Sequence, residues 1–150
     1  MTPDEQYMIM AIRQAKEAAD SGEVPIGAVL VKEGKIICTN RNRREELNDA
    51  SAHAEILVIR RAGDLLGGWR LAGCTLYVTL EPCPMCAGAM VQARLERLVF
   101  GATDPKSGAA GTLCNIVQDI RFNHRLLVTG GILQDECAAL LQQFFRVRRD

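Results

Sequence analysis

Two cysteines, Cys83 and Cys86, stand three residues apart in the segment TLEPCPMCAGAM. A Cys-x-x-Cys pair serves as a redox dithiol, as half of a structural zinc site, or as part of a catalytic metal site. His53 offers a third ligand, and one imidazole with two thiolates leaves the fourth position of a tetrahedral zinc open, as in catalytic sites. Glu55, two residues after His53, offers a carboxylate that can take a proton from a water activated by the metal.

Two other interpretations of the thiols stay open at this point. A redox dithiol fits the junction between a strand and a helix, but it gives no role to His53 or Glu55. A structural zinc needs a fourth protein ligand, and no second Cys-x-x-Cys pair exists, although further cysteines are available, namely Cys38, Cys74, Cys114 and Cys137. A zinc-stabilised binding module without catalysis would use the same ligands and leave Glu55 as a surface carboxylate.

The whole chain is typical of one compact domain over residues 1–150, because 150 residues with 48% hydrophobic content can bury a core. Its start, MTPDEQYMIM, lacks the pattern of a secretory signal, and no run approaches the ~18 apolar residues of a membrane span. We therefore expect a cytoplasmic protein with no membrane contact, whose six cysteines do not form a disulfide framework. A net charge of zero excludes a general basic field, so any RNA-binding surface must be local.

The spacing of hydrophobic residues, together with residues typical of turns and helix caps, predicts the helices and strands that position these residues. A helix starts at a capping box formed by Thr2 and Glu5, and a hairpin turns around Glu33 and Gly34. The later elements are a helix over 52–66 capped by Ser51, a strand over 74–80, a helix over 86–95, a strand over 97–102, a strand within 126–132 and a helix over about 134–148. This order predicts an α/β fold, a three-layer α/β/α sandwich around a central mixed five-stranded sheet.

The predicted helix starts explain how the chemical residues could converge. Residues two apart do not face each other within a regular helix, so His53 and Glu55 must use the helix entrance. Free backbone amides are available there, including that of Ala54, which could donate to a substrate atom. Cys83 and Cys86 occupy the entrance of the next helix, where the helix dipole favours thiolates.

The pair of motifs His53-Ala54-Glu55 and Pro82-Cys83-Pro84-Met85-Cys86 matches a known signature of zinc-dependent nucleobase deaminases, a class that includes the tRNA adenosine deaminases. With VPIGAVLV, VFGATDPKSGAAG, NHR and ECAALLQQFFRVRR, nearly the whole chain resembles the bacterial tRNA-specific adenosine deaminases. The resemblance implies a cytidine deaminase-like fold, one Zn²⁺ per subunit and a homodimer. It implies conversion of adenosine to inosine at the wobble position of the tRNA anticodon stem-loop, with Glu55 moving the protons.

The resemblance also implies substrate contacts outside the metal motif. Asn42 would hold the purine, although an asparagine in RNRRE is also typical of a turn. The loop TDPKSG would touch the RNA near the flipped base, and Phe144 and Phe145 cannot both face the core, so one could border a stacking edge. The residues implied are Ala54, Asp104, Lys106, Ser107, Asn123, Phe145 and Arg149. The sequence departs from the family pattern at Ala50 and Ser51, where proline and threonine are usual.

A rival function uses the same four residues of the metal motif. A zinc deaminase of a free base or nucleoside, of guanine or cytosine type, is favoured by the zero net charge. The arginine-bearing C-terminal segment and the DPKSGAAG loop favour the branch that acts on RNA.

Overall fold

The chain folds into ten helices and strands within the part that the structure describes. A computed structural model gives the backbone of residues 1–149 and the side chains of residues 1–148. In chain order the elements are α1 (Pro3–Asp20), β1 (Gly27–Lys32), β2 (Lys35–Arg41), α2 (Arg44–Leu47), α3 (Ala54–Leu66), β3 (Cys74–Leu80), α4 (Pro84–Gln92), β4 (Arg97–Ala102), β5 (Leu127–Thr129) and α5 (Gln134–Arg149).

The five strands form one sheet in the order β2-β1-β3-β4-β5. β1 pairs antiparallel with β2 and with β3, whereas β3, β4 and β5 run parallel to one another. The parallel pairing of β3 and β4 follows from α4, because a crossover helix returns the chain to the same end of the sheet. The predicted mixed five-stranded sheet is therefore confirmed.

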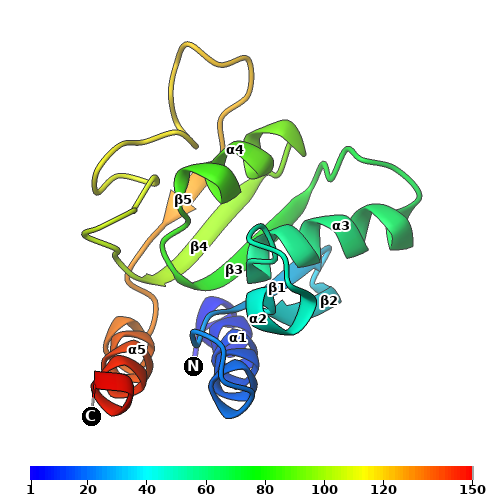
Figure 1. The fold of residues 1–150 in the computed structure, drawn as a ribbon. Helices are drawn as coiled ribbons and strands as arrows, with labels where there is room; N and C mark the ends of the chain where they lie inside the picture. Colours follow the sequence, from blue (N-terminus) through cyan, green and yellow to red (C-terminus); the bar gives the residue numbers. More distant parts are fainter. Residues whose placement is uncertain (150) are drawn as a thin grey trace.

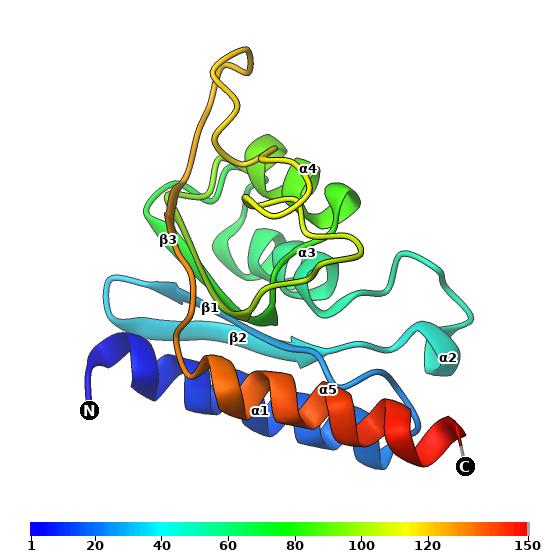
Figure 2. The ribbon, with the colours of Figure 1, turned by 90° about the vertical axis from the view of Figure 1, so that its left-hand side faces the viewer.

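Helices cover both faces of this sheet (Figure 1). α3 and α4 lie on one face, while α1 and α5 lie side by side on the other (Figure 2). Each interface buries its own apolar core, with Val58, Leu76 and Met90 in one and Met8, Val29 and Val99 in the other. The predicted three-layer sandwich is confirmed. No helix of the described chain combines the length and apolar character needed to cross a membrane.

Two helix starts differ from the sequence prediction, because α4, predicted over 86–95, spans Pro84–Gln92, and α3 begins later than predicted. The capping box of α1 is present, with Glu5 and Thr2 bonding each other's backbone amides. The prediction that Ser51 caps the next helix is wrong, because α3 begins at Ala54 with His53 at the N-cap. Ser51 instead donates from its amide and its hydroxyl to the carboxylate of Asp49, at 2.9 and 2.7 Å. The Ser51 side chain thus bonds to the nearby carboxylate of Asp49 instead of capping the helix.

Candidate active site

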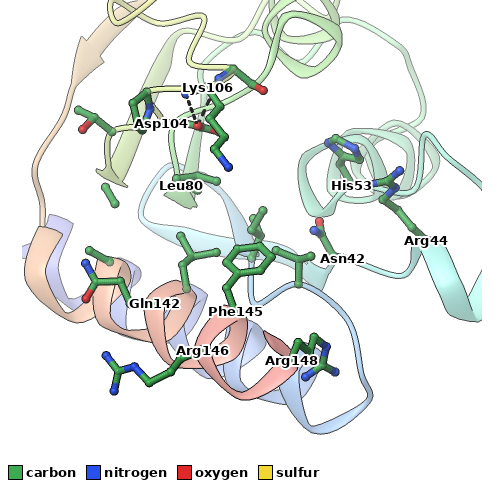
Figure 3. Close-up of a pocket in the computed structure, with 18 residues that line it drawn as sticks. Asn42, Arg44, His53, Leu80, Asp104, Lys106, Gln142, Phe145, Arg146 and Arg148 are labelled. Carbon is green, nitrogen blue, oxygen red and sulfur yellow. Dashed lines mark hydrogen bonds between the residues drawn. The ribbon is translucent and has the colours of Figure 1, made fainter. Parts of the chain in front are cut away.

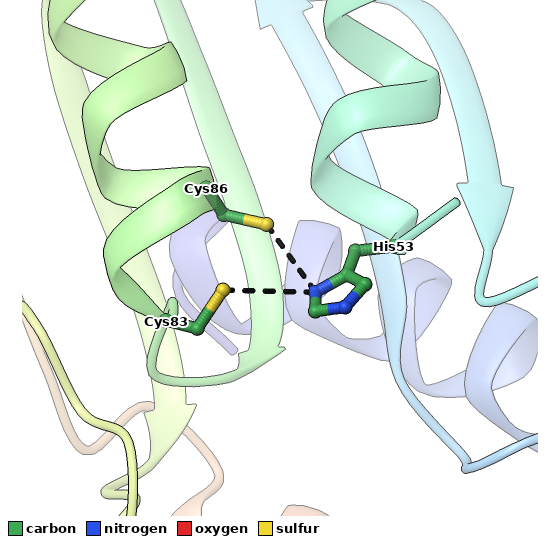
Figure 4. Close-up of side chains that lie close together, drawn as sticks. All are labelled: His53, Cys83 and Cys86. Atoms are coloured by element: carbon green, nitrogen blue, oxygen red, sulfur yellow. Dashed lines mark hydrogen bonds between the residues drawn. The ribbon is translucent and has the colours of Figure 1, made fainter. Parts of the chain in front are cut away.

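Three candidate metal ligands meet where α3 and α4 begin (Figure 4). Nδ1 of His53 lies 3.7 Å from Sγ of Cys83 and 3.5 Å from Sγ of Cys86. One ligand atom from each of the three side chains lies within 4.8 Å of the other two. His53 and Cys83 are the N-cap residues of the two helices, and Cys86 follows in the first turn of α4. Adjacent helix entrances therefore bring together residues that are 30 positions apart.

The two thiols differ in their readiness to ionise. The hydrogen bond from Cys86, aided by His53, lowers the pKa of the Cys83 thiol to about 4. The same contact with Cys83, together with burial, raises the pKa of Cys86. The protein alone thus favours one thiolate in the pair, and a cation placed among the three residues favours both as thiolates. This charge pattern fits a site built for a dication.

Glu55 is buried beside this group, with 3% of its surface exposed. Its Oε1 is the buried side-chain oxygen without a hydrogen-bond partner among residues 1–148. Burial raises the pKa of Glu55 to about 7, and its carboxyl group in turn raises the pKa of Cys86. A buried carboxylate oxygen without a partner is costly for folding, so its retention points to a role in chemistry.

Asn42 links the end of β2 to the start of α3. Its Oδ1 accepts a hydrogen bond of 2.8 Å from the amide of Ala54, which is the amide expected to be free for substrate. Asn42 is 3% exposed and lines the cleft described below. Because Oδ1 faces Ala54, Nδ2 is the atom that Asn42 can offer to a purine, and a substrate atom that takes the Ala54 amide must displace Oδ1.

A cleft of about 960 Å³ lies between the sheet, α5 and the entrance of α3 (Figure 3). It brings together six of the predicted residues, which come from β2, the α3 entrance, the loop after β4, and α5. They are Asn42, His53, Asp104, Lys106, Ser107 and Phe145. Of the two adjacent aromatics, Phe144 is buried and Phe145 is 48% exposed toward the cleft, so the expected division between core and edge is confirmed.

Comparisons with known proteins agree with this geometry. The profile of the MafB19-like deaminase family matches residues 2–149. The tRNA-specific adenosine deaminase of Bacillus subtilis is 58% identical over 149 residues, which cover 99% of this chain and 92% of that protein. The chain belongs to the tRNA-specific adenosine deaminases.

Solved structures place this deaminase in the same fold. A structure from a study of A-to-I editing by tRNA:A34 deaminases at the wobble position of transfer RNA is 47% identical, with a TM-score of 0.88 over 91% of this chain and 99% of that one. A guanine deaminase from Nitrosomonas europaea is 25% identical, with a TM-score of 0.82 over 93% of this chain and 83% of that one. The fold is thus common to a guanine deaminase and a tRNA deaminase, so the fold alone does not separate their substrates.

Three predicted contacts of the deaminase are absent from the cleft lining or lie outside the described part. Ala54 is fully buried, and its amide is bonded to Asn42. Asn123 is exposed in the long connection between β4 and β5, and it is not among the lining residues. Its neighbour His124 bonds through Nε2 to the carbonyl of Leu95 at 2.7 Å, which fixes that connection to the body of the protein. The side chain of Arg149 lies outside the described residues, although α5 and the lining residues Arg146 and Arg148 lead up to it.

The structure adds site residues that sequence reasoning missed. Arg41 and Arg43 both pair with Glu46, whereas Arg44 lines the cleft. The short helix α2, expected as a loop, presents Arg44, and its backbone amides at residues 45 and 46 donate to the buried carboxylate of Glu23 at 3.2 and 2.8 Å. The run of arginines after Asn42 was the available signal, but it does not say which guanidinium faces the cleft.

Glu81 is a further buried acid that the sequence did not single out. It follows β3 and is 2% exposed. Burial raises the pKa of its carboxyl group, but hydrogen bonds from Thr112, Asp104 and Ala110 outweigh burial and hold the pKa below its usual value. An ionised carboxylate is therefore buried two residues before Cys83.

Proposed function

We propose that this chain is a single-domain hydrolase that converts adenosine to inosine at the wobble position of tRNA anticodons. Its membership of the tRNA-specific adenosine deaminases supports this substrate, and residues 1–150 would carry the whole active site of one subunit. The observation that carries the chemical part is the buried carboxylate of Glu55, whose Oε1 has no hydrogen-bond partner, beside three side chains that could hold a metal ion. A non-catalytic binding module gives no reason to bury that carboxylate.

The three ligands suit zinc. One imidazole and two thiolates are a ligand set that zinc uses in catalytic sites, and the 4.8 Å spread of the donor atoms leaves room for a single ion among them. We infer one Zn²⁺ per subunit, held by His53, Cys83 and Cys86. Zinc bound there supplies a Lewis acid that makes water nucleophilic near neutral pH.

Glu55 moves the protons of the reaction. Water adds to C6 of adenine and ammonia leaves, so one proton must pass from the water to the ring nitrogen N1 and another to the departing amine. A carboxyl group with its pKa near 7 can accept and donate protons in turn at neutral pH. Because Oε1 has no protein partner, no hydrogen bond must break before it receives the first proton.

The cleft residues orient the flipped nucleotide. Nδ2 of Asn42 is placed to bind a purine acceptor, and Phe145 offers an exposed ring at the edge on which a neighbouring base can stack. Asp104 and Lys106 would contact the ribose and phosphates from the wall across the cleft from Phe145 (Figure 3), together with Ser107, which lines the same cleft. Ala54, Asn123 and Arg149 complete the proposed set of contacts.

The family resemblance supports a homodimer in which a partner subunit borders the RNA site, and a mass measurement in solution tests it. The dimer would give Asn123 a role, because this exposed residue lies outside the cleft of its own subunit. Because its substrate is tRNA, we propose that the protein works in the cytoplasm.

A substrate panel tests the function. The zinc-loaded protein is incubated with an anticodon stem-loop carrying adenosine at the wobble position, the same stem-loop with adenosine only at another loop position, free guanine and free cytosine. We expect inosine only in the first RNA. Because the chain is similar to a guanine deaminase, guanine is the free base most useful to test as an alternative substrate. Ammonia release from guanine with no inosine in RNA would replace the proposal by a free-base deaminase.

A further inference from the structure

The loop that follows β4 carries three of the proposed RNA contacts, and it has little regular structure of its own. It runs from Thr103 to Thr112 and contains no helix or strand longer than a single bridge. Such a segment has many accessible conformations, so something must hold it in one shape before RNA binds.

The carboxylate of Glu81 binds this loop at both ends. Oε1 accepts hydrogen bonds from the amide of Asp104 at 3.0 Å and from the hydroxyl of Thr112 at 2.5 Å. Oε2 accepts hydrogen bonds from the amides of Ala110 and Thr112, at 3.0 and 3.1 Å. Four donors converge on one buried anion, which is a stronger tether than neutral acceptors provide.

The backbone beside Glu81 binds the same segment. Its amide donates to the carbonyl of Ala102 at 2.8 Å, and the carbonyl of Pro82 accepts from the amide of Ala109 at 2.9 Å. The metal-binding turn at Cys83 follows directly. Residues 81 and 82 thus join the metal ligands to the loop that carries the RNA contacts.

Within the loop, Asp104 builds the turn that displays the contacts. Its Oδ1 accepts from the amides of Lys106 and Ser107, at 2.9 and 3.2 Å, and its carbonyl accepts from the amide of Gly108 at 2.9 Å. Gly108 leaves no space for a side chain, since a Cβ there would lie 2.5 Å from Oε1 of Glu81 and 2.6 Å from the carbonyl oxygen of Asp104. The turn is therefore packed directly against the Glu81 carboxylate.

We propose that Glu81 is a positioning residue for RNA binding, whose carboxylate holds the 103–112 loop so that Lys106 and Ser107 meet the phosphates and ribose next to the flipped adenosine. This inference rests on the proposed function. Glu81 neither lines the cleft nor belongs to the candidate metal ligands, so it acts through the loop, and its loss affects substrate binding more than the chemical step.

The variant Glu81→Gln tests the tether. Every bond that Glu81 makes to the loop is accepted from a donor, so a glutamine must turn its NH₂ group toward donors in either orientation. We expect the KM for the stem-loop to rise about tenfold while kcat stays within about threefold and zinc remains at one per chain. Thr112→Val removes one of the four bonds and is expected to raise KM by a smaller factor in the same direction.

A double-mutant cycle with Lys106→Ala separates positioning from general destabilisation. If Glu81 acts by placing Lys106, the double variant Glu81→Gln/Lys106→Ala binds the stem-loop about as weakly as Glu81→Gln alone. Gly108→Ala forces the same turn and the Glu81 carboxylate apart while residue 81 stays a glutamate, and its combination with Lys106→Ala is expected to be equally non-additive. If the fold-losses in stem-loop binding of the single variants multiply in both double variants, the inference is overturned. A parental KM in Glu81→Gln would also overturn it. Absence of inosine formation by the parent protein would instead overturn the proposed function.

Discussion

Oδ1 of Asn42 lies 2.8 Å from the amide nitrogen of Ala54 and accepts its hydrogen bond. This bond joins the end of β2 to the residue that follows His53, so it fixes the entrance of α3 where one metal ligand stands. The same asparagine lines the cleft. In the proposed mechanism, one side chain therefore connects the position of the candidate metal site with the recognition of the base.

Two substitutions of Asn42 separate these roles. Asn42→Ala leaves a buried amide without an acceptor, and we expect the free energy of unfolding to fall by about 1–3 kcal/mol. Asn42→Asp keeps an acceptor next to a helix N-terminus and should recover much of that stability, but it loses the Nδ2 donor and should remain poorly active. Urea unfolding and inosine formation measure the two effects. Parental activity in Asn42→Asp would show that Nδ2 does not bind the base.

Phe144 and Phe145 form a matched pair, because adjacent rings of the same type face the core and the cleft. We expect Phe145→Ala to weaken stem-loop binding by about 1–3 kcal/mol through lost stacking and to change stability little. Phe144→Ala should lower the free energy of unfolding by about 3 kcal/mol, because it removes a buried ring. Binding titrations and urea unfolding should give opposite rankings for the two variants. Equal binding by Phe145→Ala and the parent would remove this ring from the RNA site.

Local cations should dominate the salt dependence, because the net charge of the chain is zero. Lys106→Ala and Arg146→Ala, at the cleft, should each reduce the slope of log affinity against log salt by about 1. Lys35→Ala removes an exposed cation at the far end of β2 and serves as the control, with an unchanged slope. The measurement is a stem-loop titration at several salt concentrations. If all three variants keep the parental slope, these cations do not contact phosphates.

The ion pair between Asp4 and Arg97 predicts a specific acid response. The hydrogen bond from Arg97, 2.7 Å from its Nη2 to Oδ2, lowers the pKa of Asp4 below its ordinary value of 3.8. A lowered folded-state pKa contributes stability above the unfolded pKa, and this contribution disappears as the pH falls through the folded value. Between about pH 5 and about pH 2 the parent should therefore lose more stability than Asp4→Asn. Urea unfolding of both proteins over this pH range measures the difference. If the free energy of unfolding falls equally with pH in both, the lowered pKa of Asp4 is contradicted.

The sequence predicts those parts of the protein that depend on short spacing. The periodic segments placed α1, α3 and α5, and the Cys-x-x-Cys spacing with His53 placed the ligand group. These signals are local, because a capping box or a helix entrance is set by residues a few positions apart.

The features that the sequence did not predict depend on contacts between segments that are distant along the chain. The first amide of α3 donates to Asn42, which lies 12 residues before Ala54, whereas the predicted cap Ser51 bonds to Asp49. Glu81 meets partners that lie 23 to 31 residues later, in a loop without periodicity. No periodicity or motif in the sequence predicts these long-range hydrogen bonds.

The most direct test of the central claim compares the parent with Glu55→Gln on an anticodon stem-loop carrying the wobble adenosine. Zinc content and stem-loop affinity are measured on the same preparations. We expect both proteins to hold one zinc per chain and to bind the RNA equally, while inosine formation falls by at least ~10²-fold in the variant, because glutamine cannot move the protons. Inosine formation at the parental rate by zinc-loaded Glu55→Gln would contradict the proposed mechanism.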